Sequence, residues 1–146
     1  MPLTMIQIER WTKRVTEQRS LDVKVTRLQK GKRRNGNTVV RAVTFTTHND
    51  DGTLRRNPNK YKTWVEGLSR DKKGRPKMLI DRCHVKCSCD CDYFWAYGCE
   101  VELNKRGAAD IVFSNGKDPI IRNPNGRPWA CKHLISLFHT IQERGF

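Results

Sequence analysis

Residues 85–91 read VKCSCDC and residues 129–134 read WACKHL, and these two short stretches carry the strongest structural signal in the chain. The first stretch ends a run of strand-forming residues with a C-x-C pair, and the second places a C-x-H pair in front of an apolar helical pattern. Structural zinc sites use four thiolate or imidazole ligands at tetrahedral corners. We therefore predict a Zn²⁺ site, closed to a catalytic water, with the ligands Cys87, Cys89, Cys131 and His133.

A third cysteine in the first stretch leaves the choice of ligands open. Cys87, Cys89 and Cys91 are spaced two residues apart, so all three would face the same side of an extended strand. Cys91 could replace one member of the pair, or it could belong to the turn that follows. We take Cys87 and Cys89 as the ligands.

The two other cysteines, Cys83 and Cys99, are expected to be small core residues, because a free cysteine is usually buried. The alternative is a second metal site in which they join His84 and His139. Disulfides are disfavoured because the sequence shows no signal peptide, which makes a reducing compartment the default.

The order C-x-C then C-x-H, with an apolar residue two positions before the first cysteine and Lys-His-Leu at the end, resembles the SWIM type of zinc finger. In that family the first pair lies on a β-hairpin and the second pair opens a helix, so the resemblance implies this arrangement for residues 85 to about 141. The 41 residues between Cys89 and Cys131 exceed the usual spacer. Small phage-encoded proteins that resemble SWIM fingers carry such insertions, with an Arg-Asn-Pro stretch like the one at residues 122–124. The resemblance therefore implies a phage origin.

The rest of the chain predicts an α+β fold. Hydrophobic spacing indicates an amphipathic helix over residues 5–18, with Thr4 and Gln7 at capping-box spacing, and a second helix over residues 134–141. Alternating patterns predict an antiparallel hairpin from residues 21–26 and 38–47, joined by a long basic connection over residues 29–37. A third strand is expected over residues 78–85. We expect one domain, residues 1–146, with a basic, β-rich part (1–82) and a zinc-binding part (83–146).

Positive charge dominates the chain and is concentrated in one region. The chain has 29 Lys and Arg against 15 Asp and Glu, and residues 24–77 hold 16 of the basic and only 4 of the acidic residues. Such a region can bind nucleic acid or an acidic protein surface. The candidate contact residues are Lys30, Lys32, Arg33, Arg34, Arg55, Arg56, Lys60, Lys62, Lys72, Lys73 and Arg75.

These patterns favour a non-enzymatic, zinc-stabilised adaptor, such as a structural component of a phage head, neck or tail, that contacts neighbouring subunits through its basic half. The alternative is an accessory or regulatory protein that binds nucleic acid. No membrane partner is expected, since no apolar run is long enough to span a bilayer. No small-molecule substrate is expected either, because the predicted zinc site has no open position. The expected location is a virion or the host cytoplasm for a phage protein, and otherwise the cytoplasm.

Overall fold

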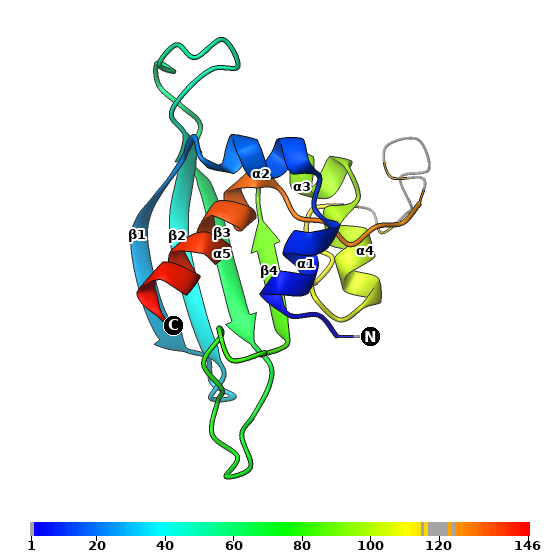
Figure 1. Cartoon of the computed structure of the whole chain (residues 1–146). Coiled ribbons are helices and arrows are strands. Elements are labelled where there is room, and N and C mark those ends of the chain that lie inside the picture. The colour runs from blue at the N-terminus through cyan, green and yellow to red at the C-terminus, as the bar shows by residue number, and fades with distance from the viewer. Residues whose placement is uncertain (1, 115, 117–122, 124) are drawn as a thin grey trace.

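The computed structural model describes residues 2–114, 116, 123 and 125–146. It confirms the α+β class: an antiparallel sheet in the order β1-β2-β3-β4 has helices packed on one face (Figure 1). Among the described helices, none has the length and apolar character needed to cross a membrane. The elements are α1 (Met5–Trp11), α2 (Arg14–Ser20), β1 (Val23–Lys32), β2 (Thr38–Thr46), β3 (Tyr61–Gly67), β4 (Val85–Cys89), α3 (Asp92–Ala96), α4 (Cys99–Lys105) and α5 (Lys132–Arg144).

The predicted N-terminal helix is two short helices. Thr4 and Gln7 form the expected capping box at the start of α1. Thr12 then adopts extended backbone angles and ends the helix. Its buried hydroxyl donates to the Ile8 carbonyl at 2.9 Å and accepts the Ala130 N–H at 3.2 Å. This contact explains the break, because it fixes the end of α1 against the segment that leads into α5.

The hairpin of β1 and β2 is confirmed, but its connection is much shorter than predicted. β1 continues to Lys32, six residues beyond the predicted end, so only residues 33–37 form the turn. A bulge between Thr26 and Gln29, with Arg27 at a φ of 50°, absorbs an irregularity in the pairing and lets the strand continue. Lys30 and Lys32 therefore lie on a strand, whereas Arg33 and Arg34 lie in the turn.

The prediction of a third strand over residues 78–85 is wrong. The fourth strand, β4, begins only at Val85, and residues 68–84 form the connection that precedes it. The strand that the sequence analysis missed is β3, which pairs with both β2 and β4. Its inward positions, Tyr61, Thr63 and Val65, do alternate with outward ones, but the many cations around them obscure the pattern that is typical of a strand.

Helix α5 forms the centre of the core. It contacts all four strands as well as α2. The predicted apolar stripe is confirmed, since Leu134, Leu137, Phe138 and Ile141 are all fully buried. We call the sheet surface under α5 the inner face and the opposite surface the outer face. The N-terminus of α5 points toward the end of β4, which brings the two cysteine-containing stretches together (Figure 1).

Gly67, the last residue of β3, is required by close packing. A Cβ atom built there would lie 2.9 Å from Leu79 Cδ2 and 3.1 Å from Cys83 Sγ, whereas one at Gly31 in β1 would meet nothing within 4 Å. We expect Gly67→Ala to lower the free energy of unfolding by about 1–3 kcal/mol, the usual cost of overpacking. Gly31→Ala is the matched control and should be neutral or slightly stabilising. Denaturant titration of both variants measures the difference, and an unaffected Gly67→Ala variant would contradict the packing.

Candidate metal centre

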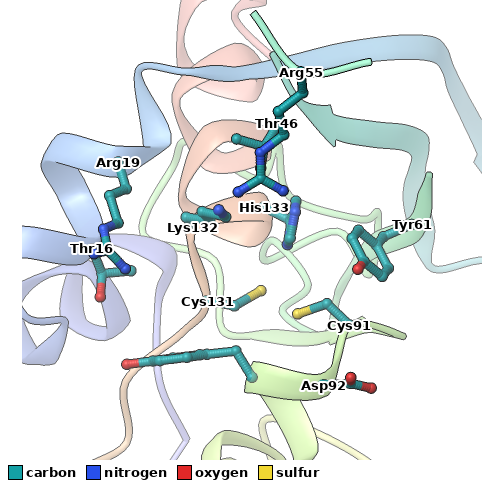
Figure 2. Close-up of a pocket in the computed structure, with 11 residues that line it drawn as sticks. Thr16, Arg19, Thr46, Arg55, Tyr61, Cys91, Asp92, Cys131, Lys132 and His133 are labelled. Carbon is teal, nitrogen blue, oxygen red and sulfur yellow. The ribbon is translucent and has the colours of Figure 1, made fainter. Parts of the chain in front are cut away.

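Four buried side chains converge where β4, α3 and α5 meet. Their ligand atoms, three sulfurs and one imidazole nitrogen, all lie within 4.8 Å of one another. Figure 2 shows the sulfur atoms of Cys91 and Cys131 facing each other below the His133 ring. The four residues are Cys89 at the end of β4, Cys91 at the N-cap of α3, Cys131 at the N-cap of α5, and His133 in its first turn.

The group contains Cys91 in place of Cys87, which corrects the predicted ligand set. Cys87 and Cys89 face the same side of β4, but two residues along a strand span about 6.6 Å, so Cys87 lies away from the N-terminus of α5. The Cys87 thiol lies instead 3.7 Å from the Ala108 carbonyl, which also accepts the Cys87 N–H at 2.9 Å. Complete burial raises the pKa of Cys87 to about 12. Cys87 is therefore a protonated core thiol.

Asp90 explains why Cys91 reaches the group. Strand β4 ends at Cys89, and the Asp90 carboxylate accepts the Lys62 N–H at 2.9 Å while its own N–H donates to the Lys62 carbonyl at 3.3 Å. This exchange fastens the chain to the start of β3 before it enters α3. Cys91, at the N-cap of α3, is then directed back toward Cys131 rather than along the strand.

His133 provides the test of whether a metal fits. Its side chain is only 4% exposed, and neither ring nitrogen has a hydrogen-bond partner. A buried polar atom without a partner costs roughly 1–3 kcal/mol, so native proteins rarely tolerate one. A metal ion bound to one of these nitrogens would remove the cost at that nitrogen, and three sulfurs with one imidazole are a usual donor set for structural zinc. The residues present therefore fit a zinc ion.

The thiols affect one another strongly. Hydrogen bonds from the Cys131 and Cys89 thiols lower the pKa of Cys91, and nearby His133 lowers it further. Burial raises the pKa of Cys89 and of Cys131. The arrangement thus favours one thiolate at Cys91, and a bound cation such as Zn²⁺ would favour deprotonation of the other two thiols.

Three cations surround a cavity of about 210 Å³ beside this centre: Arg19 from α2, Arg55 from the β2–β3 loop, and Lys132 from α5 (Figure 2). Burial lowers the pKa of Lys132, and the positive charges of Arg55 and Arg19 lower it further. Zinc bound to three thiolates and one neutral imidazole carries one net negative charge. A zinc-loaded centre would therefore offer these cations a negatively charged neighbour.

The other residues singled out from the sequence are mostly structural. Cys83 and Cys99 are buried as expected, and the described residues contain no second cluster that could hold a metal. His139 is partly exposed and pairs with Glu9 at 2.7 Å, linking α5 to α1. Asn123 is described, whereas Arg122 and Pro124 of the Arg-Asn-Pro stretch lie outside the described residues.

The candidate contact cations lie at both ends of the sheet. The β1–β2 turn and the β3–β4 connection extend from one end, and the β2–β3 loop extends from the other (Figure 1). Arg70 joins the first two segments by donating to the Asn35 carbonyl and to the Asn37 side chain, both at 2.8 Å. Lys30, Lys32, Arg33, Arg34, Lys72, Lys73 and Arg75 belong to the first end, Arg55, Arg56 and Lys60 to the second, and Lys62 to β3.

Comparisons with protein-family models, with curated proteins and with solved structures find no match for this chain. The resemblance to SWIM zinc fingers therefore stands on the ligands and their placement. That placement keeps the order C-x-C then C-x-H and keeps the second pair at the start of a helix, but the first pair departs from the implied β-hairpin, because Cys89 ends β4 and Cys91 lies beyond the strand at the N-cap of α3.

Proposed function

We propose that this protein is a non-enzymatic adaptor that a zinc ion holds in shape. The observation that carries the proposal is the buried group of three cysteines and one histidine, which offers zinc four protein ligands. A zinc ion held by all four has no open position for a water or a substrate, so its contribution is to folding.

The proposed partner is acidic, because the chain carries a formal net charge of +14. Cations extend from both ends of the sheet, so the protein could bridge two neighbouring subunits of a larger assembly, as the adaptor role in a phage head, neck or tail requires. This assembly role also draws on the resemblance to small phage-encoded SWIM-like proteins.

Nucleic acid is a second candidate partner, and one observation favours it. The Arg33 guanidinium lies over the Trp64 ring at 4.8 Å, so a cation and an aromatic side chain are combined on the sheet. Binding sites for nucleic acid use this combination, because cations neutralise phosphates and aromatic rings stack on bases.

Salt dependence distinguishes these partners. If nucleic acid binds through about four phosphate contacts, its affinity should fall roughly 100-fold between 50 and 200 mM salt, because counterion release fixes the slope. Fluorescence anisotropy of labelled DNA with the zinc-loaded protein measures this. An assembly adaptor should instead bind free DNA weakly, and it should sediment with phage particles at a fixed number of copies per particle. If the protein neither binds DNA nor sediments with particles, the binding role is contradicted, but the proposal of a zinc site is unaffected.

A further inference from the structure

The outer face of the sheet brings together side chains that lie far apart in the sequence. Residues directly opposite each other on neighbouring strands share a face. Arg41 on β2 lies opposite Trp64 on β3, the neighbouring row pairs Val43 with Lys62, and Phe45 lies opposite Lys24 on β1. The alternate rows, such as the one with Val40 and Val65, belong to the core under α5. The outer face thus carries a strip in which cations alternate with apolar and aromatic side chains.

This strip is open and positively charged. Lys24, Arg41 and Lys62 are exposed, and Phe45 and Trp64 are partly exposed. Two outer-face charges are already compensated, since Glu66 pairs with Arg33 and Lys86 pairs with Asp110 at 2.7 Å. The helices do not cover the strip, because the helix with extensive sheet contacts, α5, packs against the inner face.

The strip is also continuous with the basic segments at both ends of the sheet. Arg33 extends from the β1–β2 turn over Trp64, and Lys62 lies just after the β2–β3 loop. Seven to ten residues per strand correspond to about 23–33 Å of sheet, which is long enough to contact several consecutive nucleotides. A flexible polyanion laid along the strands would therefore meet the uncompensated cations Lys24, Arg41 and Lys62 between the two basic ends.

We propose that the outer face of the sheet binds single-stranded nucleic acid, with phosphates on Lys24, Arg41 and Lys62 and bases against Trp64 and Phe45. This inference rests on the proposed binding function and names its surface and ligand. A single strand is favoured over a duplex because its bases can unstack and lie flat on aromatic side chains. It is favoured over an acidic protein because carboxylate side chains would pair with the cations but would not stack on the aromatic rings.

The test uses the zinc-loaded full chain and a fluorescent 20-nucleotide oligothymidine, with the matching duplex and polyglutamate as competitors. We expect the single strand to bind more tightly than the duplex and polyglutamate to compete poorly. Trp64→Leu should weaken binding about 10-fold, whereas Trp64→Phe, which keeps a stacking ring, should lose much less. Equal binding of duplex and single strand, or equal loss in both Trp64 variants, would overturn the proposal.

A charge-matched pair of double variants locates the surface. Lys24→Glu with Lys62→Glu should weaken binding 100-fold or more, because two phosphate contacts become repulsive. Arg10→Glu with Arg14→Glu changes the net charge by the same amount on the exposed helices α1 and α2 and should have a much smaller effect. Equal losses would mean that only net charge matters and would overturn the assignment of the outer face. Zinc content and circular dichroism of each variant distinguish a loss of nucleic-acid binding from a loss of the metal-stabilised fold.

Discussion

Cys91→Ala is expected to abolish stoichiometric zinc binding and to unfold the protein, whereas Cys87→Ala is expected to keep one zinc per chain. Cys91 belongs to the buried ligand group, and Cys87 contacts the Ala108 carbonyl instead. A structural zinc contributes about 10–16 kcal/mol of binding free energy that is also folding free energy, which is comparable to the whole stability of a typical domain, so a variant that no longer holds the zinc should unfold. Removing the Cys87 thiol costs only about 1–2 kcal/mol of buried contact.

Each variant removes one cysteine from the same evenly spaced set of three, Cys87, Cys89 and Cys91, so each is the control for the other. Zinc per chain, measured by elemental analysis of reduced protein, and circular dichroism give the result. A zinc-free Cys87→Ala variant beside a zinc-loaded Cys91→Ala variant would return the ligand set to the one that the sequence alone favours. His133→Ala should behave like Cys91→Ala, because it also removes one of the four proposed zinc ligands.

Phe138→Ala is expected to lower the free energy of unfolding by about 3–5 kcal/mol. Its ring is fully buried on α5, the helix that contacts all four strands, so truncation leaves a cavity that the sheet and the helix cannot both close. Denaturant unfolding of the zinc-loaded protein at a fixed zinc concentration measures the change.

Glu143→Ala, at an exposed position of the same helix, is the control and should change stability by less than about 0.5 kcal/mol. The Phe138→Ala variant should still bind one zinc where it remains folded, because the residue is outside the ligand group. A loss as small as that of the control would mean that α5 does not form the centre of the core.

The elements that sequence alone predicted well are those with strong local signals. The apolar stripe of α5 repeats at helical spacing, and the capping box of α1 is local to Thr4 and Gln7. The C-x-H pair at the start of a helix identified two of the four grouped ligands. In each case the residues that determine the structure are near neighbours in the chain.

The remaining features depend on contacts between distant segments. Cys87, Cys89 and Cys91 have equal spacing, so their pattern does not distinguish them, whereas the hydrogen bonds between Asp90 and Lys62 fasten the chain just before Cys91. The break after α1 similarly depends on the bond from the Ala130 N–H to Thr12.

The outer-face strip was hidden for a related reason. Its rows combine residues from β1, β2 and β3, and β3 was not predicted. Without that strand, Lys62 and Trp64 read as part of an irregular basic segment, and no pattern within one segment relates them to Lys24 or Arg41. Only the register of the sheet shows that they share one surface.

The central claim is that one zinc ion bound by three cysteines and one histidine holds this fold together. Zinc X-ray absorption on the reduced, purified protein, combined with its metal content, tests this claim most directly. We expect one zinc per chain with three sulfur ligands near 2.3 Å and one nitrogen ligand near 2.0–2.1 Å. A folded, reduced protein without zinc, or a zinc with fewer than three sulfur ligands, would contradict the claim.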